Sequence, residues 1–423
     1  MTLADLLPSL RIALRPPLDP AVWPLTTRWT GGGDLQIGGV RVSKLAGSYG
    51  TPLHVLDEHD VRERSVGYLT AFGERSVTYS ARAGLTLETA TWIASSGLGC
   101  RVSSAAELRI ALTAGFRPAD IVLGGAGKSL ADLDAANACG AAVVAGSVAE
   151  VEQIAARAVL PQRVWLRTVP ALAGRRRTRY GVKCGTGPAL AAVAAIRSAP
   201  MLDLAGLDCD CGHQLSRFQP FESSVREVLG FATVVRSRYG ITVPAVNLGG
   251  GHAATYRCGD DGFAVDAFAV RARAMVRLSA EYFGIHEPRL TVSPGRSIMS
   301  RAGVTLTRVA AVSSNVGGLT VSLDEGVPGC GPAPCSGRHS IMLVGRESRA
   351  ALRAATVVET FGRTQTAAEL PADIEAGDLI AIAGTGGYHY AHSPSVGGAA
   401  VLGVAGGTVR TIKRRPTLEE LAS

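Results

Sequence analysis

Short apolar runs alternate with stretches of helical spacing from Val77 to Val292. The runs are rich in Val, Leu, Ile and Ala, and they recur at intervals of roughly 20–45 residues, as β-strands separated by helices do. Repeated strand–helix units of this kind build a (β/α)8 barrel. We therefore predict eight barrel strands, at Val77–Arg82, Gly99–Ser103, Asp120–Gly124, Ala142–Ala145, Arg163–Val169, Leu202–Cys211, Ala245–Leu248 and Arg289–Val292.

The pattern changes beyond residue 303, where short β-like runs are separated by Gly and Pro turns. Near the N-terminus, turn signals surround a predicted strand at Leu35–Val42, and a second predicted strand lies within Gly50–Asp57. We predict an α/β protein in which residues 1–52 join a C-terminal all-β domain at 303–423, and residues 53–302 form the barrel. The expected strands of the β-domain are Val304–Val312, Leu319–Leu323, Ile341–Leu343, Leu379–Ile382 and Ala400–Val404.

Composition favours an intracellular metabolic protein over a nucleic-acid-binding or membrane protein. The 43 basic residues include only four lysines, and the net charge of +8 is spread along the chain. The one dense cluster, Arg175–Arg177 with Arg179, is interpreted as a solvated loop, with an anion contact as the alternative. The eight cysteines form no CxxC pair, and no signal peptide or long apolar run precedes the fold. We expect a cytoplasmic protein with no nucleic-acid and no membrane partner.

Glycine-rich turns follow the last two predicted barrel strands. Gly249, Gly250 and Gly251 end the seventh strand, and Gly295 with Arg296 ends the eighth. Backbone N–H groups of such a turn can converge on an anion because no side chain stands in the way. The alternative is that these glycines serve packing only.

The stretch Val77-Thr-Tyr-Ser-Ala-Arg82 and these turns resemble the diaminopimelate and ornithine decarboxylase family, from about Gly50 to Leu418. That family depends on pyridoxal phosphate (PLP), and its barrel is of the alanine-racemase-like fold type III. The resemblance implies a PLP phosphate cradle formed by Gly249, Gly250, Gly251, Gly295, Arg296 and Tyr388. It also implies a homodimer in which the partner supplies the segment aligned with Gly362–Thr364.

Several positions depart from the family's pattern. The lysine that forms the Schiff base is replaced by Arg82, and a guanidinium stays protonated and cannot form that imine. Asp208 and Asp210 stand at two histidine positions, the second of which stacks on the PLP ring in the family. Ser293 replaces the glutamate that keeps the pyridine nitrogen protonated, and Arg101 replaces an aspartate.

Other departures affect the substrate side of the family's site. The family's partner-supplied cysteine is missing from Gly362–Thr364, and its substrate-binding arginine and tyrosine are missing from Val327–Pro334.

The changed charges predict an ion pair at the barrel mouth. Asp208 and Asp210 lie two residues apart on a strand and therefore point to the same side. We predict that Arg82 points inward and pairs with one of them. Lys128, in Gly127-Lys128-Ser129, is not part of a P-loop because Val122 stands where that motif requires glycine. It is the only other lysine that we place near a strand's C-terminal end.

The polar residues near the strand ends include possible metal ligands. Asp208, Asp210 and His213, with His252, His389 and His392, could ligate a divalent ion. Their spacing matches no known site, so we predict hydrogen-bonded polar groups at the barrel mouth and no metal.

Two functions remain open. In the first, the chain is a diverged decarboxylase-like protein of amino-acid or specialised metabolism that binds a small anionic or phosphorylated ligand. PLP would then be held without covalent attachment, or the cradle would take only phosphate or another anion, and the protein could be a pseudoenzyme. In the second, it is an active amino-acid-metabolising enzyme, carboxy-lyase-like, using non-covalent PLP or a reassigned site of Arg82, Asp208, Asp210 and His213.

Overall fold

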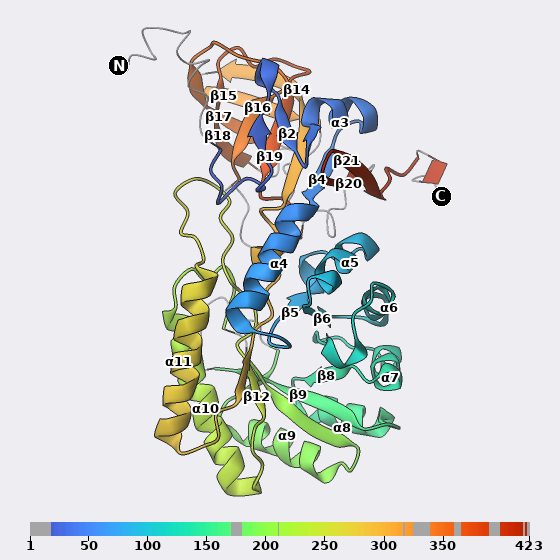
Figure 1. Cartoon of the computed structure of the whole chain (residues 1–423), viewed down its shortest axis with the longest axis vertical. Helices are drawn as coiled ribbons and strands as arrows, with labels where there is room; N and C mark the ends of the chain where they lie inside the picture. The colour runs from blue at the N-terminus through green and yellow to red at the C-terminus, as the bar shows by residue number, and fades with distance from the viewer. Residues whose placement is uncertain are drawn as a thin grey trace. The chain divides into compact units, whose positions relative to one another are not determined.

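A computed structural model describes residues 18–170, 180–209, 211–315, 318–324, 339–358, 365–388, 398–417 and 419–420. The chain forms two compact units, which are described separately. The barrel unit comprises Arg62–Ala253 and Phe263–Ser297. The β-unit comprises the residues up to Val61, Ala254–Gly262, and the residues from Ile298 onward. Figure 1 labels the elements of both units.

The barrel unit contains eight parallel strands in the hydrogen-bonded order β13-β12-β11-β9-β8-β7-β6-β5. A parallel bridge between Val77 and Val292 joins β5 to β13, which makes the sheet a nearly closed barrel and confirms the predicted fold class. A further short strand, β10 (Val182–Lys183), pairs with β9. The barrel strands are β5 (Thr78–Ser80), β6 (Gly99–Val102), β7 (Ile121–Leu123), β8 (Ala142–Ala145), β9 (Gln162–Val169), β11 (Leu202–Cys209), β12 (Ala245–Asn247) and β13 (Arg289–Thr291).

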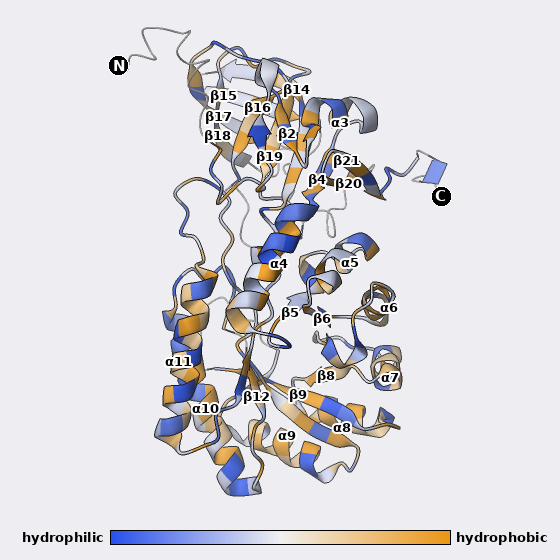
Figure 2. Ribbon diagram, in the orientation of Figure 1, coloured by the Kyte–Doolittle hydropathy of each residue, from blue (hydrophilic) through white to orange (hydrophobic). Residues whose placement is uncertain are grey.

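Most of the strands are followed by a helix whose start is marked in the sequence. Ser104, Ser129 and Ser147 each accept a hydrogen bond from the backbone N–H three residues later, which caps the helix that each precedes. Hydrophobic and hydrophilic residues alternate around these helices (Figure 2), as expected where one face packs on a sheet. The helices are α4 (Glu58–Phe72), α5 (Leu87–Ser95), α6 (Ala105–Thr113), α7 (Leu130–Cys139), α8 (Val148–Arg157), α9 (Gly187–Ser198), α10 (Gln219–Tyr239), α11 (Val265–Phe283) and α12 (Arg296–Met299).

The β-unit is built on a second sheet, of order β18-β17-β15-β14-β4-β20-β21, to which β19 and β16 are added through β14. The five C-terminal strands predicted from the sequence are confirmed, and β17, β18 and β21 were missed. β17 and β18 are rich in alanine, a residue depleted in strands, and β21 is a largely exposed, polar strand. The strands are β4 (Leu53–Asp57), β14 (Gly303–Asn315), β15 (Gly318–Leu323), β16 (Ile341–Val344), β17 (Leu352–Val358), β18 (Gln365–Pro371), β19 (Leu379–Ala383), β20 (Ala400–Ala405) and β21 (Thr408–Lys413).

The N-terminal segment packs into the core of the β-unit. Buried Trp23, Leu35 and Ile37 belong to the same hydrophobic cluster as Val55 of β4 and Leu402 of β20. The single strand predicted at Leu35–Val42 is wrong, because Gly38 and Gly39 both adopt positive φ and turn the chain. The segment instead forms β2 (Leu35–Ile37), β3 (Val40–Arg41) and helix α3 (Val42–Tyr49), and β1 (Arg28–Trp29) pairs with β2.

An apolar layer fills the barrel lumen below its polar mouth. Val144 of β8 and Trp165 of β9 are paired in register, and they form a buried cluster with Ala142 and Ala245. Arg167 lies two residues beyond Trp165 and therefore points to the same face of β9. On this face of β9, the side chains that line the barrel lumen change from apolar at Trp165 to charged at Arg167, the next residue on the same face. None of the described helices has the length and hydrophobicity of a membrane span.

Candidate anion-binding site

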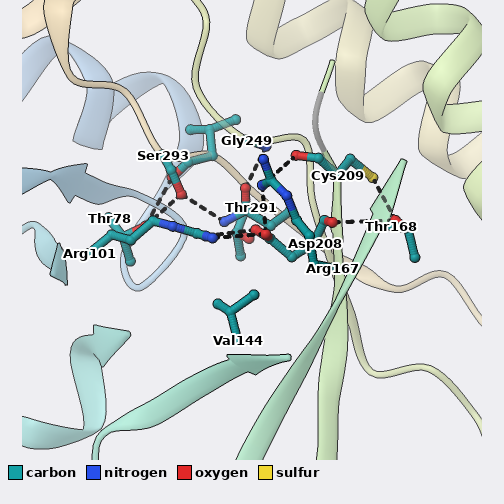
Figure 3. Close-up of polar contacts among 12 residues, drawn as sticks. Thr78, Arg101, Val144, Arg167, Thr168, Asp208, Cys209, Gly249, Thr291 and Ser293 are labelled. Atoms are coloured by element: carbon teal, nitrogen blue, oxygen red, sulfur yellow. Dashed lines mark hydrogen bonds and ion pairs between the residues drawn. The ribbon is translucent and has the colours of Figure 1, made fainter. Parts of the chain in front are cut away.

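A bidentate ion pair joins opposite sides of the barrel. Arg101 of β6 donates from Nη1 and Nη2 to the two carboxylate oxygens of Asp208 on β11, at 2.7 and 2.8 Å (Figure 3). Three strands separate β6 from β11 in either direction around the closed sheet. The pair therefore crosses the lumen, and we call it the crossbar.

Arg167 of β9 completes the crossbar from the strand beside Asp208. Its Nη1 donates to Asp208 Oδ2 at 2.8 Å. Asp208 is fully buried, whereas the side chains of Arg101 and Arg167 are 15% and 14% exposed. Burial by itself would raise the pKa of Asp208, but the two guanidinium groups hold that pKa below its ordinary value. The carboxylate therefore stays ionised at neutral pH.

The crossbar corrects the ion pair predicted from the sequence. Asp208 binds Arg101 and Arg167 rather than Arg82. β5 ends at Ser80, and Arg82 lies in a 3-10 turn (Ala81–Ala83) with an exposed side chain, not buried among apolar strand neighbours. Asp210 lies outside the described residues, so its pairing with Arg82 stays a prediction.

Lys128, the one lysine that we placed near the barrel mouth from the sequence, is held by three acceptors. Its Nζ donates to the backbone oxygen of Gly125, to Glu150 Oε1 and to Tyr180 Oη, at 2.6, 2.7 and 2.9 Å. An ammonium has three N–H donors, so all of them are used. Burial lowers the pKa of Lys128, and Glu150 opposes that effect. The contacts make this lysine a structural cation. The remaining lysines, Lys44, Lys183 and Lys413, are exposed.

Some backbone N–H groups of the predicted phosphate cradle are available to bind an anion, and one is already hydrogen-bonded within the protein. Gly249 N–H donates to Asn247 Oδ1 at 2.5 Å and is therefore not available to an anion. The N–H groups of Gly250, Gly251 and Gly295 have no acceptor among the described residues. A Cβ on Gly250 would lie 2.4 Å from the backbone oxygen of Ser293, so only glycine fits there. The glycines are thus needed for packing and also leave donors free.

Ser293 anchors the glycine turn from below. Its Oγ accepts a hydrogen bond from Asn247 Nδ2 and pairs with Thr78 Oγ1, both at 2.9 Å. Asn247 in turn accepts from Gly249 N–H. The Ser293 hydroxyl, which stands where the family has a glutamate, is therefore part of a hydrogen-bonded network of uncharged groups that holds the glycine turn.

Tyr68 of α4 ties the two turns of the cradle together. Its hydroxyl lies 2.8 Å from His252 Nδ1 and donates to Ser297 Oγ at 2.8 Å. His252 directly follows Gly251, and Ser297 directly follows Arg296. Both Tyr68 and His252 are buried, and burial lowers the pKa of His252 to about 3, so the imidazole is neutral. Sequence reasoning missed Tyr68, because nothing in the helical pattern distinguishes it from a core aromatic.

These residues fit the phosphate group of PLP, which the family resemblance implies. Three N–H donors are open, and the guanidinium-bearing residue Arg296 is buried beside them, with Nη1 at 3.5 Å from Gln214 Oε1. Gly250, Gly251, Gly295 and Arg296 would hold the phosphate. On the ring side, Ser293 offers no charge to keep a pyridine nitrogen protonated.

The remaining predicted site residues are only partly brought together. The backbone of His213 lies beside Gly251, where a Cβ would meet the Cα of His213 at 3.3 Å. Tyr388 has a left-handed backbone with φ 73 and belongs to the β-unit, so its phosphate contact stays a prediction. Within the described ranges, no group of three or more His, Cys, Asp or Glu side chains is placed to hold a metal.

Several predicted positions cannot be compared with the structure. Residues 175–177, Arg179, His389, His392 and the segments aligned with the family's substrate and partner contacts lie outside the described residues.

Comparison with known proteins gives matches across almost the whole chain. The model of the family described as pyridoxal-dependent decarboxylase, pyridoxal binding domain, matches residues 58–300. Diaminopimelate decarboxylase of Actinosynnema pretiosum subsp. auranticum is 37% identical over 442 aligned residues, covering 100% of this chain and 99% of the relative. The enzyme of that name from Mycobacterium tuberculosis strain H37Rv is 32% identical, covering 96% and 98%.

Solved structures extend the likeness to the fold. Diaminopimelate decarboxylase from M. jannaschii, determined with L-lysine, superposes with a TM-score of 0.86 at 23% identity, covering 94% of this chain and 97% of that one. At this identity the match supports the fold alone.

We expect the crossbar carboxylate to stabilise the fold in a pH-dependent way. Because the pKa of Asp208 is lowered in the folded state, its contribution is present above the unfolded pKa of about 3.9 and is lost as the pH falls through the folded pKa. Asp208→Asn should cost about 3 kcal/mol at pH 7, and the difference should shrink below about pH 4. Urea unfolding at both pH values measures it. Asp203→Asn, an exposed position on the same strand, is the control. An Asp208→Asn protein as stable as the wild type at pH 7 would contradict the assignment.

We expect Tyr68→Phe to loosen the cradle. Loss of the hydroxyl leaves His252 Nδ1 and Ser297 Oγ without their partner, which should cost about 1–2 kcal/mol in unfolding free energy. Phosphate affinity, measured by calorimetric titration, should fall with it. Tyr239→Phe removes a hydroxyl that donates to Leu190 on α9, and it should leave phosphate affinity unchanged. Equal phosphate affinity in the two variants would show that Tyr68 does not position the turns.

Proposed function

We propose that this chain, which belongs to the pyridoxal-dependent decarboxylase family, is a diaminopimelate-decarboxylase-like protein that lacks the Schiff-base lysine. It works in amino-acid or specialised metabolism and binds a small anionic or phosphorylated ligand at the cradle. Standard PLP-dependent decarboxylation is not its reaction. The observation that carries this proposal is Arg82 at the position of the family's lysine.

The state of the four lysines supports the proposal. A covalent bond to PLP needs a neutral amine within reach of the site. Lys128 is buried with its three donors occupied, and its ammonium is paired with Glu150. No lysine follows β5, where the family's lysine is expected, since Arg82 occupies that turn.

The cradle supports ligand binding without covalent attachment. Gly250, Gly251 and Gly295 supply N–H donors, and Arg296 supplies a buried positive charge. PLP, when bound, would supply an electron sink for chemistry at an amino-acid α-carbon. Ser293 and Asn247 hold the turn in place. Both side chains are neutral, so they would not keep the pyridine nitrogen protonated and would not strengthen the ring as an electron sink.

The family resemblance also suggests the setting in which the protein works. We propose a cytoplasmic homodimer, with the partner subunit contributing to the barrel mouth as the family's pattern implies.

We expect PLP to bind without attaching to any lysine. Titration of the purified protein with PLP, followed by borohydride reduction and peptide mass mapping, should give saturable binding and no modified lysine. Gly250→Asp, whose Cβ would meet the backbone oxygen of Ser293 and displace the turn and whose carboxylate would lie against the cradle, should abolish the binding. A reduced adduct on Lys128 would revive the alternative of an active PLP enzyme. If neither phosphate nor PLP binds saturably, the glycines of the cradle serve packing only.

We expect a dimer with an interface of the obligate type, burying roughly 2,000 Å² or more in total. Light scattering at micromolar concentration should give twice the chain mass of 43.7 kDa. A monomeric mass would contradict the proposal that a partner subunit contributes to the site.

A further inference from the structure

We propose that Arg101 is the recognition group for a carboxylate on the ligand, so that the barrel mouth takes a small molecule with a phosphate at one end and a carboxylate at the other. This inference rests on the proposed function and names the class of ligand that the cradle binds. It assigns a role to a residue that departs from the family's pattern.

Arg101 has donors to spare. Two of its N–H groups donate to Asp208, and a guanidinium carries five. The other three have no acceptor among the described residues. The side chain is 15% exposed, so the guanidinium is not sealed within the lumen. A planar cation with open donors is suited to bind a second carboxylate.

The surroundings favour a negative ligand at this point. Arg101 and Arg167 both donate to the one carboxylate of Asp208, so these three side chains together carry one formal positive charge. Burial is the main cause that lowers the pKa of Lys128, and the positive charge of Arg101 adds to that effect, whereas Glu150 opposes it. Gly124 makes room for the guanidinium: a Cβ there would lie 3.0 Å from Arg101 Nε. An anion beside the Arg101 guanidinium would be attracted by its positive charge.

One strand, β5, separates the strand that carries Arg101 from the strand that leads into the phosphate cradle. Ser293, beneath Gly250, follows β13; Thr78 of β5 contacts Ser293; and β6, which carries Arg101, pairs with β5 (Figure 3). Two strand spacings amount to about 10 Å between backbones, and the arginine side chain shortens that span. A phosphate and a carboxylate separated by roughly two to four carbon atoms would reach both groups.

The crossbar lies next to the apolar layer of the lumen. Arg167, which belongs to the crossbar, is two residues beyond Trp165 on β9, and Trp165 packs with Val144 in that layer. A ligand carboxylate bound to Arg101 would therefore lie at the boundary between the apolar layer and the charged mouth.

The test compares ligands that differ only in the carboxylate. Calorimetric titration of the full-length protein with 3-phosphoglycerate and with glycerol 3-phosphate should give a Kd at least about tenfold lower for the carboxylate-bearing ligand, equivalent to about 1.4 kcal/mol. Arg101→Gln should bring that ratio close to unity and leave the affinity for glycerol 3-phosphate within about twofold. Arg109→Gln, an exposed arginine on α6, is the control and should preserve the ratio.

Each outcome decides a separate point. Equal affinity of the wild-type protein for the two ligands overturns the carboxylate proposal and leaves the phosphate cradle standing. No binding of either ligand, nor of inorganic phosphate, overturns the proposed function itself. If Arg101→Gln does not fold, the wild-type ratio still decides, and Arg101→Lys, which keeps the charge but loses the planar fork, should lower that ratio.

Discussion

The barrel mouth depends on one buried carboxylate shared by two guanidinium groups. Asp208 has no exposure to water, and an ion in that position is costly unless it is paired and hydrogen-bonded. Arg101 meets both of its oxygens, and Arg167 adds a third hydrogen bond. This pairing requires the barrel to be closed, since Arg101 and Asp208 come from opposite sides of the sheet. It therefore links the tertiary fold directly to the charge that a ligand would meet.

The residues that depart from the family pattern interact with one another or with their neighbours at the barrel mouth. The resemblance expects an acid at position 101 and a base at position 208, and this chain has the reverse. Because these two residues are in contact, the exchange preserves attraction across the lumen while placing the basic residue on β6 and the acidic residue on β11. Ser293 has likewise become part of a hydrogen-bonded network, with Thr78 and Asn247, that supports the glycine turn. The polar side chains at the barrel mouth therefore satisfy one another through ion pairs and hydrogen bonds, and they offer other functional groups to a ligand than the family's residues would.

The phosphate cradle is supported independently of the crossbar. Tyr68 connects the residues that follow Gly251 and Arg296, and it holds two loops that are distant in sequence. The N–H donors of Gly250, Gly251 and Gly295 stay open in this arrangement, because none of the residues that the structure describes accepts a hydrogen bond from them. Binding of a phosphate therefore does not require the residues that perform chemistry in a decarboxylase, and the two properties can be lost or kept separately.

The sequence alone determined the parts of this protein that depend on local pattern. All eight barrel strands and the glycine turns at Gly249–Gly251 and Gly295 were predictable, because strand periodicity and backbone freedom are properties of short segments. The partner of Asp208 was not predictable. Arg82 and Arg101 are both arginines at the ends of adjacent strands, and only the closed barrel brings Arg101, 107 residues away in sequence, onto Asp208. Lys128 and Tyr68 show the same limit, since their roles depend on acceptors contributed by other elements. Side-chain pairing across a lumen is decided by strand register and closure, which no local pattern encodes.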